Sequence, residues 1–539
     1  DMVPPSNETG AAIAIGRNSL SNFIGAVALG NGATVSPAKS GGNATDGIAI
    51  GTKALVDSYR GMAIGANSQA KGSQSIVLAN NVPGAKLSTA SGIRSQVYGV
   101  ESEVSGSNSV AMGSTNTVAS HRTYAIGNNI NVAAGADDSL VFGTKASVGA
   151  PSSIALGSST KTYTNDSIAI GTLSESGGPT TGALLGTKAI AIGYAAKALG
   201  TSNVAMGYGS TAENGHDSVA IGVYAKTTNK KSTAIGTLSE ASGEQSTVIS
   251  NNFDAKGGKS ISVASGRRSQ IYGAETTVSG EQSVAIGDTN TVASARTYAI
   301  GNNINVKAGA DDSLVFGTRA NVGAVHSIAM GTTAAATGIG SIALGKSASA
   351  TEQRAIAMGE NALAGNEASM ALGYNSSAKG SKQVSIGLGA GALKNATDAG
   401  AELATFVGHY AGADNASPTG NAQGVAVGVN AGRYGVSGIR NVAVGPNSGQ
   451  KVEGDDNTAM GYNSGRGVKG TNNFAGGANA GVFVEGNNNV ALGFNAGIGA
   501  EAKPLKVNRT TAVGSDARAL ADDSVALGDH AIANNANSV

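Results

Sequence analysis

Aliphatic and small residues alternate in a five-residue phrase that returns along nearly the whole chain. Each copy reads small residue, aliphatic, alanine, aliphatic, glycine, as in Ser218-Val219-Ala220-Ile221-Gly222. A period of two is typical of a β-strand, whose successive side chains lie on opposite faces. The phrase therefore predicts a short strand with two aliphatic side chains on one face and the small residues on the other.

The phrase returns at a regular interval. Its glycines lie 14 residues apart over long stretches, for example at 331, 345, 359, 373 and 387. Fourteen residues suit two short strands and two tight turns, and Gly, Asn, Asp and Ser fill the turns because they tolerate positive φ. A fixed short period indicates stacked units rather than a globule with one cleft. We therefore expect an all-β parallel β-roll or β-solenoid, a rod of stacked coils.

The alternation also suggests a role for each face. We expect the aliphatic face to point into the coil, with these predicted core residues: Ile168, Ile170, Val219, Ile221, Val284 and Ile286. The small face would let a second backbone approach closely, so we expect copies of the chain to associate through it. The predicted contact residues are Ala169, Ala220, Ala285 and Ala343.

Breaks in the register divide the chain into three parts. Residues 1–387 carry mostly 14-residue repeats, and residues 388–514 carry repeats of 16–21 residues, a candidate subdomain. Residues 515–539 return to the shorter step and end in a truncated repeat, so we expect a fragment of a longer chain. An internal duplication relates 80–157 to 251–331.

Three connections are longer than a turn and are the predicted ligand-binding surfaces: 80–92, 251–266 and 391–405. Loops that leave a regular core are free to vary and often carry function. The candidate ligand-binding residues are Asn80, Asn81, Lys86, Asn251, Asn252, Asp254, Lys256, Lys394, Asn395 and Asp398.

Composition narrows the possible partners and chemistry. The chain has 81 Gly, no Cys and no Trp, and 36 basic residues balance 35 acidic ones. The lack of cysteine excludes disulfides and thiol chemistry, and the absence of a basic stripe argues against nucleic acid. No apolar run is long enough to span a membrane as a helix. We expect no cofactor.

Several motifs have both a chemical and a structural explanation. Residues 340–347 (GSIALGKS) match the P-loop pattern, but a phosphate loop needs a helix after it and the next repeat leaves no room for one. Asp137-Asp138 and Asp311-Asp312 could bind Ca²⁺, although turn capping explains them better. The five histidines are scattered, without zinc-ligand spacing. We expect no catalytic or metal residues.

Runs such as Asn108-Ser109-Val110-Ala111-Met112-Gly113 and Gln282-Ser283-Val284-Ala285-Ile286-Gly287 resemble the YadA-like head repeat of trimeric autotransporter adhesins. The resemblance covers nearly all of 10–539. It implies a left-handed parallel β-roll with three chains around a common axis. In the family the Val/Ile pair fills each roll and the small residues line the subunit contact.

The resemblance also implies a location and partners. These are the outer surface of a Gram-negative bacterium, a role in virulence, and host extracellular matrix proteins such as collagen or host-cell receptors. The family's neck, coiled-coil stalk and membrane anchor do not occur in this sequence, so membrane attachment would require a C-terminal anchor that is missing here.

The resulting hypothesis is a non-catalytic adhesin head that binds through many weak, repeated contacts. One alternative is a structural spacer or projecting rod, active in autoagglutination or surface attachment without a specific receptor. A remote alternative is a left-handed β-helix acyltransferase, which uses six-residue steps and a catalytic histidine. An ice-binding solenoid would need a regular threonine array, and the threonines here are irregular.

Overall fold

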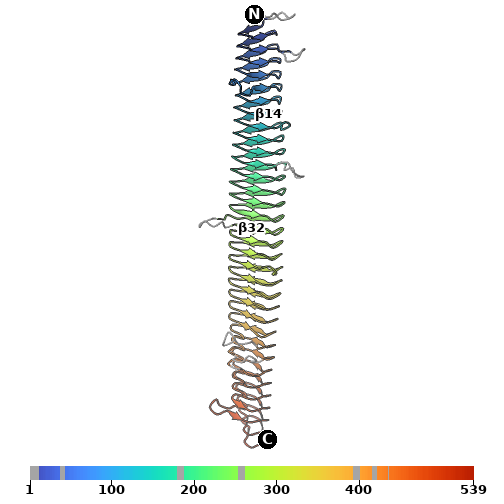
Figure 1. Cartoon of the computed structure of the whole chain (residues 1–539). Helices are drawn as coiled ribbons and strands as arrows, with labels where there is room; N and C mark the ends of the chain where they lie inside the picture. The colour runs from blue at the N-terminus through green and yellow to red at the C-terminus, as the bar shows by residue number, and fades with distance from the viewer. Residues whose placement is uncertain are drawn as a thin grey trace. The chain divides into compact units, whose positions relative to one another are not determined.

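The computed structural model describes residues 11–36, 43–178, 187–252, 261–392, 401–414, 422–434 and 436–539. Within these ranges every regular element is a β-strand. The chain divides into two compact units, residues 1–275 and 276–539. Each unit is a parallel β-solenoid in which one coil stacks on the next (Figure 1). The all-β parallel solenoid is therefore confirmed.

Each coil in the first unit carries one long strand and one short strand. The long strands have three residues each and run from β1 (Ile13–Ile15) to β33 (Gln270–Tyr272), whereas most of the short strands have two residues and a few have three. The short strands include β14 (Thr117–Val118), β20 (Lys161–Thr162), β22 (Glu175–Ser176), β24 (Lys197–Ala198), β26 (Thr211–Ala212), β28 (Lys226–Thr227), β30 (Ser239–Ala241) and β32 (Ser262–Ala264).

Neighbouring coils pair in parallel and in register. The long strand β19 (Ile154–Leu156) pairs with β21 (Ile168–Ile170), so that Ala155 lies beside Ala169. Equivalent positions of the phrase therefore stack directly on one another along the unit. The second unit repeats this arrangement from β35 (Val284–Ile286) through β43 (Ile342–Leu344) and β45 (Ile356–Met358) to β60 (Val525–Leu527).

The phrase glycine closes each long strand where two coils come closest. Gly345 has φ +132°, and a Cβ at this position would lie 2.5 Å from the carbonyl oxygen of Gly359 in the next coil. No side chain fits at that distance, and the positive φ also disfavours any residue with a Cβ. The stacking of the coils therefore requires glycine at this position of the repeat.

The longer repeats between 388 and 514 continue the ladder of the second unit. Their long strands are β50 (Thr405–Val407), β51 (Val425–Val427), β52 (Val442–Val444), β53 (Thr458–Met460), β54 (Phe474–Gly476) and β56 (Val490–Leu492), and the last pairs with β58 (Thr511–Val513). Between 422 and 485 isolated bridges, such as Glu453 with Lys469, replace most of the second strand. A separate subdomain stays a prediction.

A buried asparagine ladder fits these wider coils. Asn457 and Asn473 stand where shorter coils carry the first small residue, and the Asn473 side-chain NH₂ donates to Asn457 Oδ1 (2.9 Å). The Asn457 NH₂ also reaches the Gly470 carbonyl (2.8 Å), across its own coil. In a 14-residue coil a serine is long enough for the same task, as Ser109 shows with the Ser120 carbonyl (2.7 Å). The longer side chain compensates for the longer coil.

The interior of the coils overturns the predicted assignment of the two faces. Ala169, Ala220, Ala285 and Ala343, predicted to contact another chain, are all fully buried inside their own coil. The predicted core residues lie on the outer side of the same strands: Ile168, Ile170, Val219 and Val284 are half-buried, and Ile221 and Ile286 are 37% and 39% exposed.

The physical reason is the thinness of a coil. The two strands of one coil face each other, and most interior positions hold small residues, such as Ala343 with Ala350 or Ala169 with Ser176. Some coils hold a larger pair, such as Ile271 with Val278, and all of these residues are 0% exposed. Interiors are close-packed, and an isoleucine pair would need a wider coil. In most coils the inner position therefore carries alanine or valine, and the larger aliphatic side chains cover the outside of the long strands.

Candidate interaction surfaces

The outer side of the long strands forms an apolar face in each unit. In the first unit the register stacks Ile170, Ile192, Met206, Ile221 and Ile235 in one column. In the second unit Met330, Leu344, Met358 and Leu372 form the equivalent column. We call this surface the long-strand face.

Many side chains of the long-strand face are strongly exposed in the single chain. The third strand position is the most exposed, and its residues more than about one-third exposed include Met112, Phe142, Met206, Ile221, Ile249, Ile286, Phe316, Met330 and Met358. Soluble single chains rarely expose continuous apolar surface of this kind, and such surfaces mark interfaces. The long-strand face is thus the structure's candidate contact with other copies.

The short strands present a different face. Most of their outward positions carry polar or charged side chains, and Glu175 lies between two lysines of neighbouring coils, 3.3 Å from Lys161 and 3.9 Å from Lys197. Lys226 and Glu240 form a similar pair at 3.6 Å. These groups are partly hydrated, so each pair contributes little to stability. We call this surface the short-strand face, and it is suited to water.

Tyrosines stack on the turns between the two faces of the first unit. The rings of Tyr194 and Tyr208 are parallel, with centroids 5.1 Å apart, and Tyr224 meets Tyr208 edge-on at 5.3 Å. All three are about half exposed. Sequence reasoning missed this ladder, although an aromatic follows the phrase glycine in successive repeats, as in Gly193-Tyr194 and Gly207-Tyr208.

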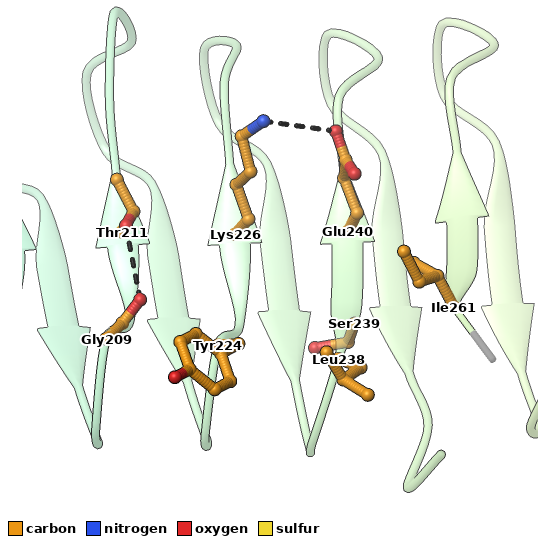
Figure 2. A pocket seen from close by; sticks show the side chains of 8 residues that line it. All are labelled: Gly209, Thr211, Tyr224, Lys226, Leu238, Ser239, Glu240 and Ile261. Carbon is orange, nitrogen blue, oxygen red and sulfur yellow. Dashed lines mark hydrogen bonds and ion pairs between the residues drawn. The ribbon is translucent and has the colours of Figure 1, made fainter. Parts of the chain in front are cut away.

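A shallow hollow of about 270 Å³ opens beside the last of these tyrosines. Figure 2 shows Tyr224 and Leu238 in the turns, with Thr211, Lys226 and Glu240 on the short strands next to them. Gly209, Ser239 and Ile261 complete the lining. Gly209 leaves space for the ring, because a Cβ there would lie 2.7 Å from Tyr224 Cε1. Ile261 belongs to the predicted connection 251–266.

Arginine and aspartate form two-pronged pairs between adjacent coils. The Arg122 Nε–H donates to Asp138 Oδ1 (2.5 Å) and the Nη2–H to Oδ2 (2.8 Å). The same geometry recurs at Arg296–Asp312, Arg440–Asp456 and Arg509–Asp523. Two parallel bonds are the strongest form of this contact because they fix both orientation and charge. These pairs clamp neighbouring turns together.

The four Arg–Asp pairs predict that the stability of the fold depends on pH. In each pair the hydrogen-bonded guanidinium lowers the pKa of the aspartate: Asp138, Asp312, Asp456 and Asp523. Because the folded-state pKa lies below the unfolded value of about 3.9, their stabilisation is present above that value and disappears as pH falls through the folded-state pKa. A variant with all four changed to Asn should melt a few degrees below the parent at neutral pH.

The melting difference should shrink below about pH 4 and in concentrated salt, which screens exposed charges. Thermal melts followed by circular dichroism from neutral to acidic pH measure it. Equal melting temperatures at neutral pH and low salt would show that the clamps do not stabilise the fold.

In the Asp137-Asp138 and Asp311-Asp312 sequences, the first aspartate hydrogen-bonds to the turn of the preceding coil. Asp137 Oδ1 accepts a hydrogen bond from the His121 N–H (2.9 Å), and Asp311 Oδ1 accepts one from the Ala295 N–H (2.9 Å). The prediction of turn capping is therefore confirmed. Within the described ranges no three His, Asp or Glu side chains gather closely enough to hold a metal ion.

Two of the predicted ligand-binding residues act inside the fold. Asn81 is 2% exposed; its NH₂ donates to the Asn67 carbonyl (3.0 Å), while Oδ1 accepts from the Ser88 hydroxyl (2.8 Å) and the Glu101 N–H (2.7 Å). The amide holds the long connection onto the coil before it. A ligand at the surface cannot reach it, so its prediction as a ligand-binding residue is wrong.

Asn252 repeats these bonds in the duplicated block. Its NH₂ donates to the Leu238 carbonyl (2.9 Å), and Oδ1 accepts from the Ser262 hydroxyl (2.9 Å) and the Glu275 N–H (2.7 Å). It is also 2% exposed, so its prediction as a ligand-binding residue is wrong for the same reason. The duplication thus preserves a structural amide.

The other predicted ligand-binding residues are exposed or lie outside the described ranges. Asn80 and Asn251 are exposed, and Lys86 is exposed and pairs with Glu103 at 3.2 Å. The structure does not bring these three into the tyrosine hollow. Outside the described residues lie Asp254, Lys256, Lys394, Asn395 and Asp398.

The P-loop pattern has a structural role. Its centre is the long strand β43, and Lys346 pairs with Glu360 of the next coil at 3.0 Å. The short strand β44 (Ser349–Ala350) follows directly, so no helix N-terminus faces the glycines. The residues that would bind phosphate in a P-loop here form a strand of the sheet and an ion pair between coils. Nowhere in the described part of the chain is there a helix able to cross a membrane.

A family model described as the YadA head domain repeat (2 copies) matches the chain many times, over more than half of its length. The matched ranges are 11–33, 43–68, 58–78, 134–160, 149–174, 185–210, 204–225, 214–239, 228–249, 273–290, 279–303, 308–334, 336–362, 350–376, 364–390, 508–531 and 519–539. The longer repeats between 391 and 507 lie outside them. No curated protein matches the chain.

Proposed function

The chain belongs to the YadA head family, and from this premise we propose that it is the head of a bacterial surface adhesin that assembles as a homotrimer. The family and the β-solenoid point to a structural adhesin rather than an enzyme, and to a location at the cell surface. The proposal adds the assembly, the surface that makes it and a role in binding the host.

The long-strand face is the observation that carries the proposal. It presents two columns of outward side chains that are aliphatic on most coils, and side chains such as Ile221 and Met358 are more than one-third exposed in the single chain. Burial of apolar surface contributes about 25 cal/mol per Å², so a column repeated on dozens of coils favours association strongly. Three parallel copies that meet at a common axis would each bury this face against the other two.

The surfaces that remain exposed in the trimer would then bind the host. The short-strand face and the turns are polar, and every trimer would present three copies of each feature. Weak contacts become strong when several act together, because each later contact forms within one molecule. We propose host matrix proteins such as collagen, or host-cell receptors, as partners, and the outer surface of the bacterium as the location.

Two other functions remain testable alternatives. A spacer that holds other domains away from the cell, or makes cells adhere to each other, would use the same trimer without a receptor. An acyltransferase built on six-residue steps is not favoured, because long strands pair at offsets of 14 residues, as in Ile342 with Ile356.

The experiment measures assembly and binding separately. Analytical ultracentrifugation of the whole chain should give the mass of three copies. A panel of immobilised matrix proteins and host cells should then retain the trimer at concentrations where a β-rich control protein is not retained. A trimer that binds no member of the panel would favour the spacer, and a stable monomer would contradict the proposed assembly.

A further inference from the structure

A second surface of the first unit has the features of a binding site. The tyrosine ladder and its hollow lie on the turns and the short-strand face, with Thr211, Lys226 and Glu240 supplied by β26, β28 and β30. The long-strand face lies on the other strands of the same coils. Assembly through the long strands would therefore leave the hollow open to a ligand.

From the chemistry of this hollow we propose that it binds a neutral oligosaccharide chain. This inference deepens the adhesin function and rests on it for its biological meaning. The ligand class follows from three features: an exposed aromatic surface, mixed donors and acceptors beside it, and a balanced charge.

The aromatic surface is the first feature. Tyr224 is 53% exposed, and Leu238 and Ile261 extend the apolar floor on neighbouring coils. An aromatic ring has a negative face, which attracts the weakly positive C–H groups of a flat ligand. Sugar rings present such C–H faces and carry hydroxyl groups around their edge. Tyrosine is also enriched where binding energy concentrates.

The polar groups beside the ring match a hydroxylated ligand. Lys226 carries three donor protons, Glu240 accepts hydrogen bonds, and the Thr211 hydroxyl does both. Thr211 donates to the Gly209 carbonyl (3.3 Å) and can still accept a bond from a ligand. Figure 2 shows these groups in one row above the tyrosine. A sugar hydroxyl needs both a donor and an acceptor within reach, and this row supplies them.

The balanced charge favours a neutral ligand over a charged one. Lys226 and Glu240 lie 3.6 Å apart and cancel each other, and among the residues that the structure describes no other charged side chain lines the hollow. A phosphate or sulfate would meet Glu240 as well as Lys226. Neutral hydroxyl and acetamido groups avoid that repulsion.

The backbone argues against an extended peptide as the ligand. A peptide that adds as a strand needs unpaired N–H and C=O groups at a sheet edge. The strands around the hollow already pair with each other, Lys226 with Thr211 on one side and with Glu240 on the other. A ligand in the hollow would therefore be held mainly by side chains and would not add a strand to the sheet.

The hollow is large enough for only part of an oligosaccharide. Its volume of about 270 Å³ is slightly below the usual range for enclosed small-molecule pockets. The ladder of Tyr208 and Tyr194 continues from it over the preceding coils. A linear oligosaccharide can lie along this row with one unit in the hollow, whereas a single sugar would gain few contacts.

The test uses the whole chain on an array of immobilised oligosaccharides: neutral hexose and N-acetylhexosamine chains, with sulfated chains as a charge control. The parent should bind neutral chains, and concentrated salt should leave this binding unchanged. Truncation of a central aromatic contact costs about 2 kcal/mol, so Tyr224→Ala should weaken binding by about thirtyfold.

A matched control is Tyr374→Ala. Tyr374 is 49% exposed and directly follows a phrase glycine, as Tyr194 and Tyr208 do, but its coil lies in the second unit, where Glu360 and Leu388 flank it at the equivalent turns. This variant should bind as the parent does. Lys226→Met should weaken binding without changing the melting temperature, which separates a lost contact from a lost fold.

Several outcomes would overturn the proposal. These are no binding to any neutral chain, binding only to sulfated chains at low salt, or equal losses in Tyr224→Ala and Tyr374→Ala. If matrix proteins or cells still retain the trimer while the array stays empty, the adhesin function holds and its ligand is a protein. If the array binds but the panel of host partners does not, the saccharide site stands without the proposed host.

Discussion

A variant with aspartate at Ile168, Ile221 and Ile286 is expected to remain folded and to lose its self-association. All three side chains lie on the long-strand face, half-buried or more than one-third exposed in the single chain. In a trimer each would bring three carboxylates together near the common axis. Burial of unpaired charge there costs several kcal/mol per site, so the assembly should weaken by several orders of magnitude.

The measurement is the mass in solution, with far-ultraviolet circular dichroism to confirm the fold. A control places the same three charges on the short-strand face, at Ser147, Thr277 and Ser349, which are half-buried at outward positions of their strands. That variant should keep the mass of the parent. If both variants assemble equally well, the long-strand face is not the interface.

Ala220→Asp is expected to have the opposite effect and to unfold its part of the ladder. Ala220 is fully buried, and the register places Ala205 and Ala234 directly above and below it. A carboxylate at this position would have no water and no cation, a cost of several kcal/mol. Because each coil contacts mainly its neighbours, the damage should stay local.

Limited proteolysis should detect the local unfolding as new cleavage between about 207 and 236, that is, within one coil on either side of the substitution. The adjacent residue offers a matched control, because Ile221→Asp introduces the same group on the outer side of the same strand. Ile221→Asp should resist the protease in the single chain and weaken assembly instead. Equal sensitivity of both variants would mean that the two sides of the strand are not distinct.

The tyrosine ladder illustrates a level of organisation that repeats alone do not reveal. The repeat predicts that a residue after one phrase glycine lies near its equivalent in the next coil. Whether the side chains meet depends on rotamers and turn shape: Tyr194 and Tyr208 stack in parallel, while Tyr224, one position further from its glycine, meets Tyr208 edge-on. The Arg122–Asp138 clamp likewise spans 16 residues in a mostly 14-residue repeat, because the coil between them is longer.

In the long connections too, the sequence did not reveal which contacts the side chains make. Their length and position identify places where the chain leaves the ladder, and Asn81 and Asn252 are polar residues in such places. Their burial follows from the bonds they make to neighbouring coils, which depend on the path of the backbone. Polarity in a connection therefore did not distinguish a ligand contact from a structural amide.

Sequence alone determined the strands, the step between coils, the parallel stack and the family, because each follows from local alternation and its repetition. It also separated each long strand into an aliphatic side and a small side. Which side is inside was decided only by the tertiary structure. In most short coils the two strands approach closely and alanines such as Ala220 and Ala343 fill the interior, while Ile221 and Leu344 lie outside; a few coils bury a larger residue such as Ile271. Large apolar residues usually fill protein cores, but the narrow space between the two strands of a coil favours small ones here.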